Sequence, residues 1–157
     1  ESEGAAPVDL HDVAQRVAGR LASFADGQGV EVRIEGASAR IAGSETLAEE
    51  MLYNLIENGI RYNHEGGSVV MRVRADAAAG QATVTVSDTG PGIPEELHDK
   101  VFERFFRVDK SRSKETGGTG LGLAIVKHAV LQHRGTIEVK SALGEGTTFV
   151  LRFPLAD

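Results

Sequence analysis

The sequence contains no cysteine, so neither a disulfide framework nor a thiolate metal site is possible. It has no apolar run that approaches the ~20 residues needed by a membrane-spanning helix, and no segment typical of a signal peptide. It also lacks an excess of cations, because 17 lysines and arginines face 23 acidic residues and give a net charge of −6. This balance argues against a nucleic-acid-binding domain, which usually carries a basic stripe. We therefore expect a soluble domain.

The chain length predicts one domain. A sequence of 157 residues can bury about two-thirds of the surface of its unfolded chain. Residues 1–7 are small and polar, so we expect a linker there, and residues 8–157 are expected to form the domain. The sequence shows no internal repeat and no second domain.

Hydrophobic spacing predicts helices interspersed with pairs of strands. Helical periodicity favours helices over residues 9–25, 44–64 and 120–133, with Asp9 and Ser44 as the N-caps of the first two. Alternation with period two favours strands over residues 30–34, 38–42, 69–75, 82–88, 135–141 and 147–153, the first two as a hairpin. Pro94 is expected to open a short helix. This order favours an α+β fold, a two-layer α/β sandwich with helices on one face of the sheet.

Two asparagines share one face of the second predicted helix. Asn54 and Asn58 are four residues apart, and Arg61 follows on the same face. Asparagine is costly inside a helix because its amide competes for backbone hydrogen bonds, so this pair needs partners. A carboxamide oxygen suits Mg²⁺, an ion that often bridges protein to phosphate. The alternative is that both amides face solvent or cap the backbone of a loop.

Asp88 ends an alternating strand and is followed at once by Gly90 and Gly92. A carboxylate there can accept a hydrogen bond from the exocyclic amine of adenine, whereas guanine offers a carbonyl at the same place. Leaving such a buried partner unpaired costs about 1–3 kcal/mol. The glycines let the backbone approach the ring or adopt a positive φ. The alternative is an ordinary Asp-x-Gly turn, which is favoured when this segment is taken alone.

A glycine-rich run, Gly118–Gly122, leads into the last long predicted helix. Free N–H groups and the positive end of the helix would face an anion such as a phosphate. The run is not a Walker A loop, because no Gly-Lys-Ser/Thr follows. It is not a Rossmann fingerprint either, because no strand feeds directly into it.

The segment between the two glycine-rich stretches is positively charged in an otherwise acidic domain. Phe102, Phe105 and Phe106 can anchor its base. Its cations are Arg107, Lys110, Arg112 and Lys114. We expect a mobile lid over a triphosphate, with Arg107 at the γ-phosphate. The alternative is a solvated charged loop with a small apolar anchor.

Taken together, four segments in this order resemble the N, G1, F and G2 boxes of bacterial sensor histidine kinases, in their catalytic ATP-binding domain. The segments are Asn54–Asn58, Asp88–Gly92, Phe102–Arg107 and Gly118–Gly122, and the resemblance runs from about Val8 to Pro154. It implies a mixed sheet of about five strands covered on one face by about three helices. It also implies that ATP is held between these layers, under a mobile lid.

The resemblance assigns residues to the nucleotide. Asn58 is implied as the Mg²⁺ ligand, and Asn54 lines the same site. Arg61 stands where a cation meets phosphate, and Tyr62 matches an aromatic position that packs on the nucleotide. The other implied contacts to ATP are Asp88, Gly90, Gly92, Ile93, Lys110, Gly118, Thr119, Gly120, Leu121 and Gly122.

Two further positions are left open by the sequence. Gly59 departs from the family, in which alanine is usual, and glycine inside a helix costs roughly 1 kcal/mol against alanine. It either allows close backbone packing or has no structural reason. Thr148 matches a family position near adenine, but the alternation of its strand is ambiguous and we assign it no role.

The resemblance implies phosphoryl transfer more than hydrolysis. In related ATPases such as DNA gyrase and MutL, the position of Asn54 is typically a glutamate that acts as general base toward water. Asparagine cannot take that proton near neutral pH. Glu57 lies nearby, so slow hydrolysis stays open, and the catalytic candidates are Asn54, Glu57 and Arg107. The alternatives are a serine kinase of the anti-sigma type and a nucleotide-sensing module without transfer.

None of the five histidines lies in a context that resembles a phosphoacceptor motif. The resemblance therefore implies that the accepting histidine lies on a separate helical dimerisation domain, and that a response regulator is served from there. We expect the isolated chain to be a monomer and its parent a homodimer. We also expect the parent to be a membrane-anchored sensor with this domain in the cytoplasm.

Overall fold

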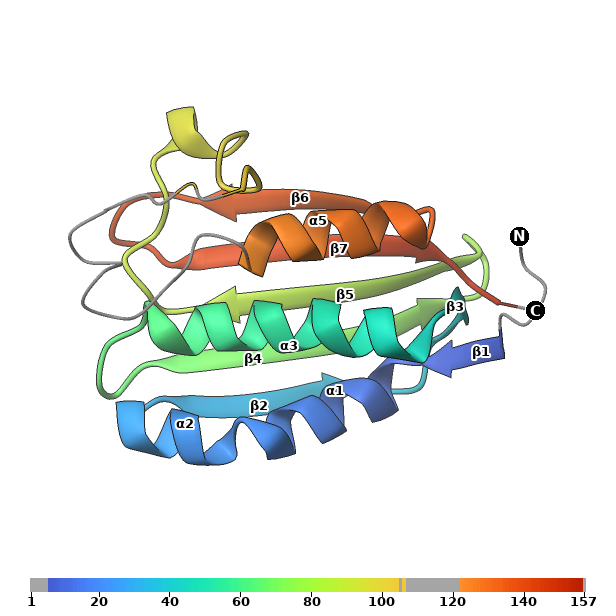
Figure 1. Cartoon of the computed structure of the whole chain (residues 1–157), viewed down its shortest axis with the longest axis horizontal. Helices are drawn as coiled ribbons and strands as arrows, with labels where there is room; N and C mark the ends of the chain where they lie inside the picture. Colours follow the sequence, from blue (N-terminus) through green and yellow to red (C-terminus); the bar gives the residue numbers. More distant parts are fainter. Residues whose placement is uncertain (1–5, 105, 107–121, 157) are drawn as a thin grey trace.

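The computed structural model describes residues 6–104, 106 and 122–156. Its main feature is a five-stranded mixed sheet with strand order β2-β4-β5-β7-β6, and helices lie along one face of this sheet (Figure 1). The helices are α1 (Leu10–Arg20), α2 (Ala22–Gln28), α3 (Glu45–Arg61) and α5 (Gly122–Gln132), with a 3₁₀ turn η1 (Glu95–Leu97). The strands are β1 (Ala6–Asp9), β2 (Glu31–Gly36), β3 (Arg40–Gly43), β4 (Ser68–Asp76), β5 (Gln81–Asp88), β6 (Thr136–Ser141) and β7 (Thr147–Pro154). The predicted two-layer α/β sandwich is confirmed.

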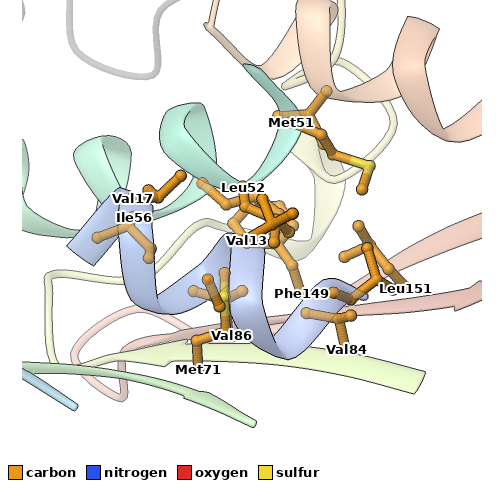
Figure 2. Packing of buried hydrophobic residues seen from close by; sticks show 14 of the residues in the cluster. Val13, Val17, Met51, Leu52, Ile56, Met71, Val84, Val86, Phe149 and Leu151 are labelled. Atoms are coloured by element: carbon orange, nitrogen blue, oxygen red, sulfur yellow. The ribbon is translucent and has the colours of Figure 1, made fainter. Parts of the chain in front are cut away.

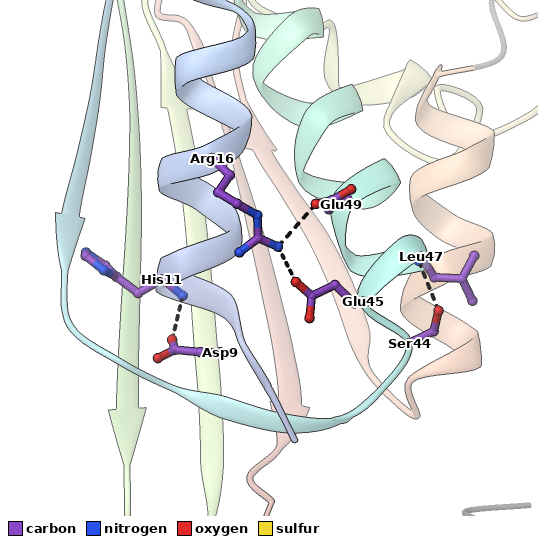
Figure 3. Close-up of polar contacts among 7 residues, drawn as sticks. All are labelled: Asp9, His11, Arg16, Ser44, Glu45, Leu47 and Glu49. Carbon is purple, nitrogen blue, oxygen red and sulfur yellow. Dashed lines mark hydrogen bonds and ion pairs between the residues drawn. The ribbon is translucent and has the colours of Figure 1, made fainter. Parts of the chain in front are cut away.

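Both predicted N-caps are present (Figure 3). The Asp9 carboxylate accepts a hydrogen bond from the backbone N–H of His11 at 3.0 Å, and the Ser44 hydroxyl accepts one from Leu47 at 3.2 Å. Each cap satisfies an N–H group that the first turn of a helix leaves unpaired. The first predicted helix is nevertheless two helices, since the chain leaves helical geometry at Leu21 before α2 begins.

The predicted hairpin of residues 30–34 with 38–42 is wrong. β3 pairs antiparallel with β1, whereas β2 pairs in parallel with β4. Gly36 takes a φ of 104° at the end of β2, and the next backbone N–H bonds to Val73 instead of closing a hairpin. Ala6 and Pro7 lie in β1, so the predicted linker does not include these two residues, and residues 1–5 lie outside the described part of the chain.

The hydrophobic core fills the space between the helices and one face of the sheet (Figure 2). α3 lies centrally and packs against α1, α5 and the strands beneath it. Its buried side chains include Met51, Leu52 and Ile56, and the sheet contributes Met71 and Phe149 among others. Strand alternation places the side chain of every second sheet residue on the opposite face, which no described helix covers.

An ion-pair cluster ties α1 to the start of α3. Arg16 contacts the carboxylates of Glu45 and Glu49, the latter at 3.1 Å (Figure 3). The Arg16 and Glu45 side chains are exposed and that of Glu49 is half-buried, so this cluster contributes little to the free energy of unfolding. The ion-pair cluster lies at the N-terminal end of α3, and the predicted site is at the other end of this helix. The cluster therefore belongs to the scaffold and not to the predicted site.

Three elements end together at one edge of the molecule. The C-terminal end of α3, the N-terminal end of α5 and the C-terminal end of β5 lie on the same side in Figure 1. Within the sheet, Asp88 at the end of β5 is opposite Val69 on one neighbouring strand and Thr147 on the other. The predicted N and G1 boxes and the end of the G2 box therefore meet at this edge.

Candidate functional site

A backbone N–H group orients the Asp88 carboxylate. Gly90 donates to Oδ1 at 2.8 Å, and the nearby backbone of Thr147 on β7 also favours the charged form. Burial raises the pKa of this carboxyl from 3.8 to about 6, and the two backbone groups oppose that rise. The group is therefore a half-buried, oriented acceptor that is mostly ionised at neutral pH.

Gly59 explains how α3 can lie so close to this carboxylate. A Cβ on Gly59 would stand 3.0 Å from a methyl group of Val69 and 3.6 Å from the Cβ of Asp88. The absent side chain allows the helix to pack directly onto β4 beside the end of β5. A side chain at this position would press on Val69, so glycine permits this close approach of α3 to β4.

The G1 turn is equally close to the end of α3. A Cβ on Gly90 would lie 3.1 Å from the backbone oxygen of Tyr62 and 3.0 Å from Oδ1 of Asp88. Tyr62 is the C-cap of α3, so its backbone abuts the turn that follows the carboxylate. The sequence segments around Asn58 and Asp88, which are separated along the chain, thus form one wall.

The second half of the G1 turn is fixed to the connection between β6 and β7. Gly92 has a φ of 82°, and a Cβ there would stand 2.0 Å from the backbone oxygen of Ala142, so only glycine fits. Ile93 is buried, and its N–H donates to the Ser141 hydroxyl at 2.7 Å. Ser141 also lies 2.8 Å from the hydroxyl of Thr147.

Sequence reasoning missed Ser141 and Thr147. The backbone of Thr147 lowers the pKa of Asp88, whereas the Thr148 hydroxyl lies 2.9 Å from that of Ser87. Asp88 is paired directly with Thr147 in the sheet register, and this pairing was not readable from one strand alone. The Gly144-Glu-Gly146 turn before Thr147 was the available signal.

Asn54 lies against the first residue of α5. A Cβ on Gly122 would stand 3.2 Å from Oδ1 of Asn54, and the Asn54 amide donates to the backbone oxygen of Glu50 at 2.7 Å. The carboxamide oxygen of Asn54 is thereby turned toward the N-terminal end of α5. Asn58 lies one turn further along α3 and is half-buried. The asparagine face and the end of the G2 box are thus adjacent.

The Arg61 side chain extends from α3 toward α2. Its guanidinium lies 3.0 Å from the Glu57 carboxylate and 5.1 Å from the centre of the Phe24 ring on α2. Glu57, the candidate for slow hydrolysis, is accordingly in an ion pair. Arg61 and Glu57 remain predictions as site residues.

The structure describes part of the aromatic anchor that the sequence predicts at the base of the cationic segment. The Phe102 ring packs edge-on against Phe149 with centroids 6.0 Å apart, and Nζ of Lys127 lies 5.6 Å from the Phe102 centroid. Phe106 is half-buried against the core, and Phe105 lies outside the described residues. The other predicted site residues outside the described part of the chain are Arg107, Lys110, Gly118, Thr119, Gly120 and Leu121, together with the lid.

Known proteins resemble this chain both in sequence and in fold. The profile of the family "Histidine kinase-, DNA gyrase B-, and HSP90-like ATPase" matches residues 43–157. The chain is 43% identical over 148 residues to the sensor-like histidine kinase SenX3 of Mycobacterium tuberculosis, which covers 94% of the chain and 36% of that protein. It is 35% identical over 148 residues to the phosphate regulon sensor protein PhoR of Pseudomonas aeruginosa, covering 94% of the chain and 33% of that protein. The chain thus spans about a third of the length of these curated relatives.

Solved structures give the same result for the fold. The mycobacterial sensor histidine kinase MprB superposes with a TM-score of 0.84 at 30% identity, covering 96% of the chain and 97% of that structure. Full-length ShkA, solved in complex with AMPPNP, superposes with a TM-score of 0.81 at 30% identity, covering 97% of the chain and 31% of that structure. The match to MprB includes nearly all of both chains.

Proposed function

The chain belongs to the family of histidine kinase-, DNA gyrase B- and HSP90-like ATPases, and from this membership we propose that it presents ATP for phosphoryl transfer to a histidine. It is the ATP-binding catalytic domain of a sensor histidine kinase. The accepting histidine would lie on a separate helical domain of the parent protein. The observation that carries the proposal is the meeting of Asp88, the Asn54 face and the start of α5 at one edge.

Asp88 would hold the base. Its Oδ1 accepts from Gly90, and burial limits competition from water, so the carboxylate is oriented to accept a hydrogen bond from an exocyclic amine. Adenine has this amine, and guanine has a carbonyl in its place. Gly90 and Gly92 leave the surrounding backbone without side chains, and Ile93 and Tyr62 flank the same turn.

The phosphates would lie toward α5. The helix begins at Gly122 beside Asn54, and the backbone N–H groups of a helix N-terminus favour anions. Mg²⁺ would be held by the carboxamide oxygen of Asn58, with Asn54 in the same site. No cluster of three or more acidic or histidine side chains suited to a metal occurs among residues 6–104, 106 and 122–156. A single amide ligand nevertheless suits Mg²⁺, which keeps several waters and binds phosphate oxygens.

Catalysis by this chain would consist of positioning and charge neutralisation. A phosphoryl transfer needs the γ-phosphate in line with the attacking nitrogen, and little covalent chemistry is required of the protein. Asn54 cannot act as a general base toward water, which favours transfer over hydrolysis. Glu57 is paired with Arg61 at 3.0 Å, and we assign to it only slow hydrolysis in the absence of an acceptor. Arg107 and Lys110 remain the predicted cations at the triphosphate.

The parent's partners and location follow from the same proposal. A phosphorylated histidine would pass its phosphoryl group to a response regulator, and the helical domain would make the parent a homodimer. ATP is available in the cytoplasm, so we place the domain there. In the described part of the chain, no helix combines the length and apolarity that a bilayer crossing requires.

Transfer of labelled phosphate tests this proposal. The chain is incubated with γ-labelled ATP and Mg²⁺, alone and with a histidine-bearing helical domain from a histidine kinase. We expect no label on the chain alone and an acid-labile label on the helical domain once it is added. Acid-stable label on serine would instead favour the anti-sigma type of kinase, and bound ATP without any transfer would favour a sensing module.

A further inference from the structure

Thr89, the residue between Asp88 and Gly90, is held by the loop after α3 and by the first residue of β4. Its hydroxyl accepts a hydrogen bond from the backbone N–H of Ser68 at 2.9 Å and donates to Oδ1 of Asn63 at 3.0 Å. Its own N–H donates to the Ser68 carbonyl at 3.2 Å. Side chain and backbone of Thr89 are therefore both fixed to Ser68 at the start of β4.

Asn63 is oriented by three hydrogen bonds of its side chain. Its amide nitrogen donates to the Ser68 carbonyl at 3.0 Å. Its oxygen accepts from the Thr89 hydroxyl and from the N–H of His64, the latter at 2.9 Å. The oxygen of the carboxamide meets only donors and its nitrogen meets an acceptor. The carboxamide therefore has one favourable orientation.

Two neighbours complete this arrangement, which we call the Asn63–Thr89 clamp. A Cβ on Gly67 would stand 2.1 Å from Oδ1 of Asn63 and 2.6 Å from Oγ1 of Thr89, so a larger residue there would separate the two. The Nε2 atom of His64 lies 3.0 Å from the carbonyl oxygen of Thr89. The clamp thus contacts the side chain, the N–H and the carbonyl of Thr89.

The clamp acts on Asp88 through the next residue. Gly90 follows Thr89, and its N–H is the donor that orients the carboxylate at 2.8 Å. The Thr89 carbonyl lies in the same peptide plane as this N–H, and His64 contacts it. The contacts with Asn63 and Ser68 hold the side chain and the N–H of Thr89, the residue from which this peptide plane continues. We propose that Asn63 and Thr89 are positioning residues that hold the G1 turn in the geometry needed to bind an adenine base. This inference rests on the proposed function, because it concerns how that same carboxylate is aimed.

Calorimetry with single-site variants of the whole chain tests the clamp. Thr89→Val removes the hydroxyl at nearly constant size, and Thr89→Ser retains it. We expect Thr89→Val to weaken binding of Mg·ATP by about tenfold, the loss expected when one hydrogen bond is misplaced. Adenosine and ADP should lose the same factor, because the clamp lies at the base and not at the phosphates. Thr89→Ser should bind within about twofold of the unaltered chain.

The matched control is Thr85→Val on the same strand. Thr85 lies three residues before Asp88, opposite Val150 in the register, and its side chain is on the face away from the helices. The Thr85→Val variant should bind Mg·ATP with the affinity of the unaltered chain. Urea unfolding of every variant separates lost positioning from lost folding, since each must be fully folded at the binding temperature.

The outcomes separate the clamp from the proposed function. If the unaltered chain binds no adenine nucleotide, the proposed function fails. If it binds ATP and folded Thr89→Val binds equally well, the clamp is overturned while the proposed function stands. If Thr89→Val weakened the binding of ATP but not of adenosine, the clamp would also be overturned. In an Asp88→Asn background Thr89→Val should add no further loss, and full additivity would contradict an action through Asp88.

Discussion

Asp88 is subject to opposing requirements. Its proposed role in base recognition needs an ionised, partly buried carboxylate, while burial raises its pKa to about 6 because the charge loses solvation. A folded-state pKa above the usual 3.8 means that the folded chain binds this proton more tightly than the unfolded chain does. The associated stability is fully present below about pH 3.8 and is lost as pH rises through about 6.

Asp88→Asn should therefore stabilise the nucleotide-free chain at neutral pH. The neutral amide avoids the desolvated charge and keeps an oxygen for the Gly90 N–H. We expect the free energy of unfolding at pH 7.5 to rise by roughly 1–3 kcal/mol, with the gain falling toward zero near pH 4. Urea unfolding at both pH values measures this, with Asp26→Asn on α2 as control. An equal effect of Asp88→Asn at both pH values would contradict the assigned cause.

Single-residue reasoning located one half of the site. Asp88, Gly90 and Gly92 could be predicted because a carboxylate followed by glycines is a local pattern. Ser141 and Thr147 could not, because their contacts with the G1 turn are made between segments far apart in the chain. The hydrogen bond between Ile93 and Ser141, for example, joins residues 48 positions apart.

At the scale of elements, helices and strands followed the hydrophobic pattern closely. The caps at Asp9 and Ser44 are present, and β4, β5, β6 and β7 lie within a residue or so of the predicted strands. The errors concern which strands pair with one another. A short spacing between two alternating segments predicted a hairpin, but the preceding strand β1 pairs with β3 instead. Which strands pair depends on tertiary packing, which a local pattern does not contain.

The junction of α5 with the start of α3 depends on His133. This histidine is buried, its Nδ1 lies 2.8 Å from the carbonyl of Ala129, and its Nε2 accepts the N–H of Ser44 at 3.1 Å. The ring also occupies the space beside Gly43, where a Cβ would stand 2.0 Å from its Cδ2. With one nitrogen donating and the other accepting, the neutral Nδ1–H tautomer matches both contacts.

His133→Ala should destabilise the chain by about 2–4 kcal/mol, since it leaves a cavity and an unpaired N–H at Ser44. Thermal or urea unfolding measures the loss. His128→Ala, at an exposed position of α5, the helix that ends just before His133, should change stability by less than about 0.5 kcal/mol. Equal small effects of both substitutions would show that the buried ring does not hold this junction.

At the scale of the whole molecule, the fold brings four separated segments to one edge of a sandwich. α3 supplies asparagines, β5 supplies the carboxylate, α5 supplies a helix N-terminus, and the β6–β7 connection supports the turn between them. The order of the boxes along the chain could be read from the sequence. Their meeting depends on the pairing of β5 with β4 and β7 and on the placement of α3 over β4 and β5, which a local sequence pattern does not contain.

The central claim is that this edge binds the adenine of ATP through Asp88. Isothermal titration of the chain with Mg·ATP and Mg·GTP, repeated on Asp88→Ala and on the exposed control Asp26→Ala, tests it most directly. We predict binding of ATP with strong preference over GTP, a loss of about tenfold to hundredfold in folded Asp88→Ala, and no change in Asp26→Ala. Equal affinity for ATP and GTP, or tight ATP binding by Asp88→Ala, would contradict the account.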